Sequence, residues 1–353
     1  MIRSKKRYYL WICLLLVGSF VFMGCQPTNS IPYGEACLCG RYSEEIYVGL
    51  QASSAMVQLV VLTFFAEGYV KKEIQLNDDG TFTIDIPVVF NTWCQIGLEG
   101  YHIGVFLLPG QKTEFEMTMG VSRKRNLKMI EGVGWTEEDS KEEEVQVSEI
   151  SKTLTPNWSF PESISTETYQ QHVINNLNEI RKEVENNTQI LYNRKQILIN
   201  RYKMAYLYWC VLNSDENPYG GPQPLTKASD FTFLKYFKLN DLSEFYTSGY
   251  MLVLHKILEM EVFQIPLIGD TSVEIWLKEV KAILADLIGS DTGFFYDLLA
   301  ANAYCLQLKN GSKPFSNRQI ENIKAYFPNE TYIDVLMAEN EKTIGLNRSN
   351  NLE

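Results

Sequence analysis

Residues 74–86 read IQLNDDGTFTIDI, and this stretch decides the fold class of the front half of the chain. Apolar residues alternate with polar ones on both sides of the segment 77–80, and a period of two predicts half-buried β-strands. The alternating apolar residues are Ile74, Leu76, Phe82, Ile84 and Ile86. Between them, Gly80 tolerates the positive φ that a tight turn needs. The stretch therefore predicts two strands joined by a hairpin turn.

Similar signals continue on both sides of this stretch. Phe115, Met117 and Met119 alternate with polar residues, and residues 59–65 form a nearly continuous apolar run, typical of a strand covered on both faces. Turn signals recur about every ten residues, which is the spacing of small all-β domains. Residues 34–120 are therefore expected to form a small antiparallel β-sandwich or barrel, the β part of an α+β chain.

The N-terminus predicts where the protein resides. Four basic residues at positions 3–7 precede an apolar run at 10–23 that is too short to cross a bilayer comfortably, so residues 1–24 are predicted to be a signal peptide. The run ends in Gly24-Cys25, which resembles a bacterial lipobox. The resemblance implies acylation of Cys25, cleavage before it and a lipidated tether over residues 25–33. Gln26 resembles the residue after the cysteine in outer-membrane lipoproteins. The alternative is a short anchor helix with an incidental cysteine.

The charge balance restricts the partners. The chain carries a formal net charge of −11, which makes it a poor ligand for nucleic-acid phosphates. Residues 1–24 hold four positive and no negative side chains, so their removal lowers the charge from −11 to −15. Anionic lipid surfaces repel such a protein, so the lipid on Cys25 is expected to be its membrane contact. We predict an envelope lipoprotein of the outer membrane, on its periplasmic or outer face, with a protein partner and no nucleic acid.

The middle of the chain is charged rather than apolar. Basic residues at 123–128 are followed by a run at 137–144 with six carboxylates and one lysine, a net charge of −5. Opposite charge blocks without apolar periodicity are typical of solvated linkers, so residues 121–164 are expected to be one. Residues 165–346 then show helical periodicity and are predicted to form an all-α domain, with residues 347–353 as a tail.

The helical part begins with its longest periodic stretch, residues 165–213. Apolar residues recur there every seven positions, but Arg181, Thr188 and Lys195 occupy the second stripe that a coiled coil would need. A break near 186–188 would divide the stretch into two helices. Further helices are predicted at 242–260, 272–288, 293–308, 317–327 and 331–344. Pairs of residues typical of helix starts support these assignments: Asp241 with Glu244, Asp270 with Glu274, and Ser316 with Gln319.

Few residues have a spacing that supports catalysis or metal binding. His102, His172 and His255 lie far apart and have no partner at zinc-ligand spacing. The tripeptide 291–293, Asp-Thr-Gly, matches aspartic proteases, but it occurs once and precedes a helical pattern, so Asp291 is expected to cap a helix. We predict no catalytic residue, metal or cofactor.

Cysteine chemistry is the remaining enzymatic option. Cys37 and Cys39 share one face of a predicted strand, where parallel side chains are poorly oriented for a disulfide, so they are expected to be core cysteines. Redox enzymes usually place Cys-x-x-Cys at a helix start, a spacing that the sequence does not contain. A redox role for Cys37, Cys39 or Cys94 is kept as an alternative.

Two parts of the chain resemble thioredoxin-family thiol–disulfide interchange lipoproteins of Gram-negative bacteria. GVFLLPG at 104–110 with TEF at 113–115 is similar to their N-terminal β domain, and three later segments are similar to their helical middle region. These segments are GFFYDLL at 293–299, IENIKAYF at 320–327 and IDVLMAEN at 333–340. In that family a thioredoxin domain with Trp-Cys-x-x-Cys follows. The resemblance therefore implies a family scaffold without that domain, lost through truncation or encoded by a separate gene.

The resemblance implies a non-catalytic, lipid-anchored accessory or protein-binding module that kept the family's scaffold. Two alternatives remain open at this point. One is a thiol–disulfide redox fragment, and the other is a glycan- or peptide-binding lipoprotein that uses the aromatic residues of segment 202–237.

Overall fold

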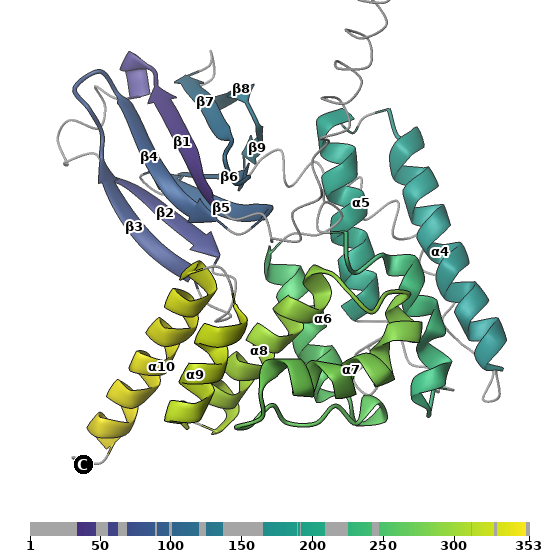
Figure 1. The fold of residues 1–353 in the computed structure, drawn as a ribbon. Coiled ribbons are helices and arrows are strands. Elements are labelled where there is room, and N and C mark those ends of the chain that lie inside the picture. The colour runs from purple at the N-terminus through teal and green to yellow at the C-terminus, as the bar shows by residue number, and fades with distance from the viewer. Residues whose placement is uncertain are drawn as a thin grey trace, which may run out of the picture. The chain divides into compact units, whose positions relative to one another are not determined.

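A computed structural model describes most of the chain beyond the N-terminal region (Figure 1). The predicted signal peptide, the tether with Cys25 and most of the predicted linker lie outside the described residues. The described residues are 34–46, 56–62, 69–88, 90–98, 101–119, 125–136, 165–188, 190, 192–208, 225–241, 247–311, 313–327 and 330–350.

The strands form two sheets, and the described strands do not close into a barrel. The first sheet has the order β4-β1-β7-β8. Its strands are β1 (Gly34–Tyr42), β4 (Thr81–Val88), β7 (Lys112–Met119) and β8 (Arg125–Glu131). β1 pairs antiparallel with β4 but parallel with β7, so the expectation of a purely antiparallel β part is wrong for this pair. Several strands of the second sheet lie between β1 and β7 in the sequence. This long connection allows β1 and β7 to run in the same direction, which a short hairpin turn would not.

The second sheet is antiparallel throughout, with the order β3-β2-β5-β6-β9. Its strands are β2 (Met56–Leu62), β3 (Tyr69–Gln75), β5 (Thr92–Leu98), β6 (Tyr101–Leu107) and β9 (Val133–Thr136). Buried residues from both sheets belong to one apolar cluster. In that cluster Gly40 leaves room for two rings, because a Cβ there would lie 2.3 Å from Phe82 Cε1 and 2.6 Å from Phe115 Cζ.

The turn at 77–80 is present, but it does not make a hairpin. Gly80 has φ 75° and its N–H donates to the Asn77 carbonyl at 2.9 Å. The strand before the turn, β3, pairs with β2, whereas the strand after it, β4, pairs with β1 in the other sheet. Alternation of apolar residues fixes which face of a strand is buried and leaves its hydrogen-bonding partner open, so the pairing could not follow from this stretch.

Two strands extend the β part into the predicted linker. β8 and β9 occupy residues 125–136, so residues 121–164 do not form a linker throughout. Leu127 and Met129 pack against the apolar cluster of the sheets, and Lys128 between them is exposed. The basic residues of this segment obscured that alternation. The acidic run at 137–144 lies outside the described residues.

The described second half is helical. Its elements are α4 (Thr166–Asn186), α5 (Tyr192–Tyr206), the 3-10 segment η3 (Ala228–Phe237), α6 (Thr247–Glu259), the short 3-10 turn η5 (Glu261–Phe263), α7 (Val273–Ile288), α8 (Phe294–Gly311), α9 (Asn317–Tyr326) and α10 (Glu330–Asn350). The predicted break near 186–188 is confirmed, as is the Ser316–Gln319 capping box. The 3-10 segment η3 was not predicted. Within the described residues no helix combines the length and apolarity needed to cross a membrane.

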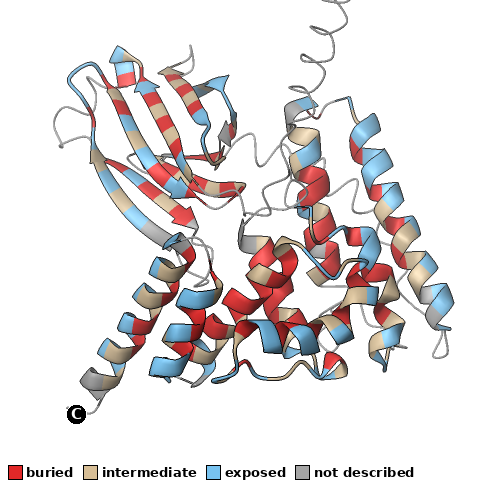
Figure 2. Cartoon of the chain, viewed as in Figure 1, coloured by how far each residue is buried: buried red, intermediate tan, exposed pale blue. Residues whose placement is uncertain are grey.

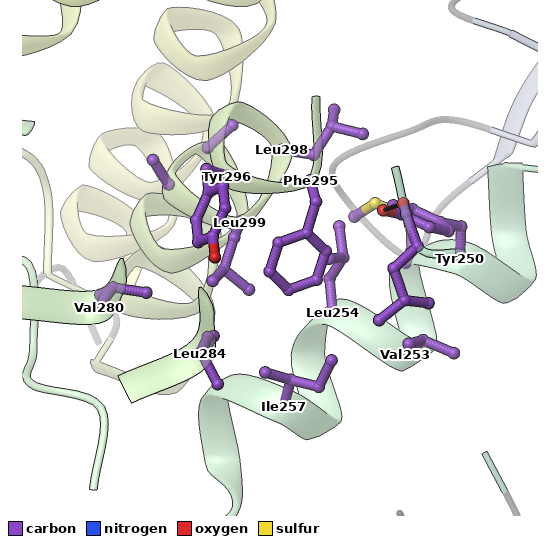
Figure 3. Close-up of a cluster of buried hydrophobic side chains, with 14 of the residues drawn as sticks. Tyr250, Val253, Leu254, Ile257, Val280, Leu284, Phe295, Tyr296, Leu298 and Leu299 are labelled. Carbon is purple, nitrogen blue, oxygen red and sulfur yellow. Dashed lines mark hydrogen bonds between the residues drawn. The ribbon is translucent and has the colours of Figure 1, made fainter. Parts of the chain in front are cut away.

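Helices α6, α7 and α8 contribute many residues to the largest apolar cluster, which also includes residues of α4, α5, η3, α9 and α10 (Figures 2 and 3). Leu254 and Ile257 from α6 face Leu284 from α7 and Phe295 from α8. Trp276 is almost fully buried and its indole N–H donates to the Pro266 carbonyl at 2.7 Å, which satisfies its polar atom. Burial of this many large side chains supplies the main stabilisation of the helical part.

One predicted helix cap is replaced by a residue from another part of the chain. The N-terminus of α8 is capped from a distance, because Asn240 Oδ1 accepts from the Phe295 N–H at 3.1 Å, so the expectation for Asp291 is wrong. The predicted acidic start of the helix from 272 is present, because Ser272 caps α7 by accepting from the Ile275 N–H at 3.5 Å and Glu274 lies in its first turn. The Asp270 carboxylate accepts a hydrogen bond from Ser316 Oγ at 2.5 Å. The predicted Asp241 cap cannot be compared, since Glu244 lies outside the described residues.

Candidate functional site

The first candidate site is the thiol pair on β1. Ala36, Leu38 and Gly40 face the apolar cluster, so the residues between them face outward. Cys37 and Cys39 are therefore half-buried on the outer face, and the expectation that they are core residues is wrong. Their Sγ atoms lie 3.7 Å apart.

The surroundings of the pair oppose ionisation. Burial, the hydrogen bond with Cys39 and the charge of Asp85 together raise the pKa of Cys37 to about 11. Asp85 is the residue opposite Cys37 on β4. Because the thiolate is the nucleophile, a thiol with this pKa is protonated and slow to react at neutral pH. A redox enzyme needs the opposite shift.

The other two described cysteines are structural. Burial raises the pKa of Cys94 to about 12, and it also raises the pKa of Cys305. Both thiols are buried in apolar clusters. The indole of the preceding residue, Trp93, lies over Gly104, where a Cβ would come within 1.7 Å of the ring. Trp93 and Cys94 therefore contribute to the packing of the β part. Cys210 lies outside the described residues.

The histidines are not brought together. His102 is exposed on β6, and His255 is buried in α6. His172 Nε2 contacts Asn176 Nδ2 at 2.9 Å, and burial lowers the pKa of His172. Among the described residues, no group of three or more His, Cys, Asp or Glu could hold a metal ion.

The second candidate is a pocket of about 240 Å³ among α4, α5 and η3. Its apolar wall consists of Ile174, Leu177, Ile180 and Ile199. The lining residues have helical spacing. Positions 174, 177, 178 and 181 share one face of α4, and positions 199 and 203 share one face of α5. The pocket is therefore formed by facing surfaces of two helices and closed by the end of η3.

The polar lining of this pocket is basic, and we call the site the basic pocket. Its polar residues are Asn178, Arg181, Lys203, Tyr236 and Lys238, and none of the nine lining residues is acidic. Lys203 is only 6% exposed, whereas Arg181 and Lys238 are exposed. Lys238 has φ 51° and ψ 52°, a left-handed conformation at the end of η3. The backbone there turns immediately after Tyr236 and Phe237, which places Lys238 at the pocket.

Sequence reasoning missed the basic pocket. One signal was present, because Arg181 interrupts the second apolar stripe of the predicted helix. Lys203 and Lys238 are more than twenty residues away in sequence from Arg181, and η3 was not predicted, so nothing in the sequence joins them. Tyr236 belongs to the aromatic segment 202–237, in which Tyr206, Phe231, Phe233 and Phe237 are buried in the core and Tyr202 and Tyr208 are half-buried.

No protein-family model, curated protein or solved structure matches the chain. The resemblance to thiol–disulfide interchange lipoproteins therefore stays a prediction.

Proposed function

We propose that the chain is a non-catalytic, lipid-anchored protein of the bacterial cell envelope that binds a protein partner through its helical part. The observation that carries this proposal is the basic pocket, where three cationic side chains converge beside an apolar wall. Concave sites with a few convergent polar groups on an apolar lining are typical of binding sites. In this proposal the two sheets form a sandwich domain that supports a separate helical domain.

The state of the thiols favours binding over redox catalysis. Cys37, Cys94 and Cys305 all have a raised pKa, so each is protonated at neutral pH. A thiol–disulfide enzyme depends on a lowered thiol pKa. For these three thiols the redox alternative would require a partner that lowers the pKa, whereas the causes found at each of them raise it.

The proposal is tested by crosslinking in cells. A photoreactive phenylalanine derivative replaces Tyr236, which is 54% exposed and lines the basic pocket. The matched control carries the same group at Tyr192, which is 92% exposed and is not among the lining residues. We expect a single crosslinked protein, identified by mass spectrometry, from position 236 and not from position 192. Crosslinks that are equal at both positions, or that persist unchanged in Arg181→Gln, would contradict the proposal.

A further inference from the structure

The basic pocket differs in charge from the protein around it. The chain has a net charge of −11, yet the described lining contains three cations and no carboxylate. Lys203 and Lys238 also interact within the chain, so a ligand would add to their contacts. Arg181 is exposed at the pocket, and its planar guanidinium can donate two parallel hydrogen bonds to a carboxylate.

The apolar wall and the size restrict the ligand further. Ile180 and Ile199 are buried, and Ile174 and Leu177 are half-buried, so one side of the pocket offers aliphatic carbon only. A volume of about 240 Å³ corresponds to roughly eight water-sized groups. A highly charged, fully polar anion would leave this wall without a partner. A carboxylate on a short apolar chain satisfies both sides.

We infer that the basic pocket binds a carboxylate carried on a short apolar group, with Arg181 and Lys238 holding the carboxylate and the isoleucines contacting the apolar part. This inference rests on the proposed function, because it names the chemistry by which a partner is recognised. The same chemistry has two sources, a free aliphatic acid or the C-terminal carboxylate of a peptide that ends in an aliphatic residue.

The test uses the full chain in a neutral detergent with isotope-labelled isoleucine methyl groups. Hexanoate is titrated against hexanamide, which has the same shape without the charge, and against acetate, which lacks the apolar part. We expect saturable shifts of the Ile174, Ile180 and Ile199 methyl signals with hexanoate, weaker shifts with acetate and none with hexanamide. The exposed residue Ile275 serves as the internal reference.

A pair of arginine variants separates the pocket from general surface charge. Arg181→Gln should weaken hexanoate binding roughly tenfold, the cost of losing a charged hydrogen-bond partner. Arg201→Gln, on exposed α5 surface and not among the lining residues, should leave it unchanged. Equal binding of hexanoate and hexanamide, equal affinity in both variants, or no saturable binding of any carboxylate would overturn the inference.

A second arm distinguishes the two sources. A short peptide ending in leucine is titrated with a free and with an amidated C-terminus. Tighter binding of the free peptide than of hexanoate assigns the site to peptide C-termini, and the reverse order assigns it to free acids. If neither binds while the crosslink from position 236 persists, the carboxylate inference fails and the proposed function stands. If hexanoate binds and no crosslink forms, the proposed protein partner fails instead.

Discussion

At Cys37 the folded protein makes a thiol less acidic. Burial is the largest cause, followed by the hydrogen bond to Cys39, the charge interaction with Cys39 and then the negative charge of Asp85. The pKa rises from 9.0 to about 11, which lowers the thiolate fraction at neutral pH roughly 100-fold. Because the pKa is higher in the folded protein, protonated Cys37 contributes to the free energy of unfolding. This contribution is fully present below pH 9 and is lost as the pH rises through about 11.

This shift predicts slow alkylation of Cys37. Iodoacetamide should modify Cys37 in the folded protein roughly 100-fold more slowly at pH 8 than in the unfolded chain, with the rate rising up to about pH 11. Asp85→Asn should accelerate the reaction because it removes one cause of the raised pKa. Glu35→Gln, an exposed change on the same strand, is the control and should have no effect. Peptide-resolved mass spectrometry measures the rates. A rate that levels off below pH 9 would refute the prediction.

The pKa of His172 is shifted in the opposite direction to that of Cys37, so its contribution to stability has the opposite dependence on pH. Burial lowers its pKa, and the charge of Glu179 offsets part of that effect. The folded protein therefore binds a proton at His172 less readily than the unfolded chain does. This contribution to the free energy of unfolding is fully present above pH 6.5 and is lost as the pH drops through the lowered pKa. Urea unfolding between pH 7.5 and 5 should show a decline that His172→Gln reduces. His102→Gln, on the exposed face of β6, should leave the decline as it is in the unaltered chain.

At the scale of elements, α8 depends on a residue far away in the chain. Asn240 Nδ2 donates to the Thr292 carbonyl at 3.0 Å while its Oδ1 accepts from the Phe295 N–H. Gly293 has φ 105°, and a Cβ there would lie 2.7 Å from Asn240 Oδ1. Glycine is thus required twice, for the backbone conformation and for the close approach of the capping amide.

Gly293→Ala should lower the free energy of unfolding by about 1–3 kcal/mol, because it strains the backbone and displaces the cap. Gly345→Ala is the matched control, since a Cβ at this exposed position within α10 meets no atom within 4 Å. It should stabilise the helix by about 0.5–1 kcal/mol. Urea unfolding compares the two. Equal stability of both variants would show that the Asn240 cap contributes nothing.

The elements show how far local patterns predict this fold. The helix from 317 begins at its capping box, and the break after Asn186 lies where expected, because capping and periodicity act within one segment. The errors concern partners far apart in sequence. β3 and β4 lie in different sheets, Asn240 caps α8 in place of Asp291, and Arg181 meets Lys238 in one pocket. Alternation and spacing do not encode such contacts.

At the scale of the whole molecule, the proposed lipid and the acidic net charge would have separate consequences. Acyl chains on Cys25 would hold the protein at a membrane, whereas a net charge of −15 after cleavage repels anionic headgroups. If Cys25 is acylated as proposed, Cys25→Ser removes the attachment and should move the protein from the membrane fraction to the soluble fraction. The measurement is an immunoblot of fractionated cells, with Cys305→Ser as a control for loss of a thiol.

The purified Cys25→Ser protein extends this prediction to the surface itself. It should not sediment with anionic vesicles at low salt, because the electrostatic term is repulsive and least screened there. The basic pocket does not alter this expectation, since its three cations are few against the net charge and Lys203 is buried. Sedimentation of Cys25→Ser with anionic vesicles would mean that a basic surface, rather than the lipid, holds the protein at the membrane. Retention of Cys25→Ser in the membrane fraction would instead assign the attachment to the apolar run at 10–23, as an uncleaved anchor helix.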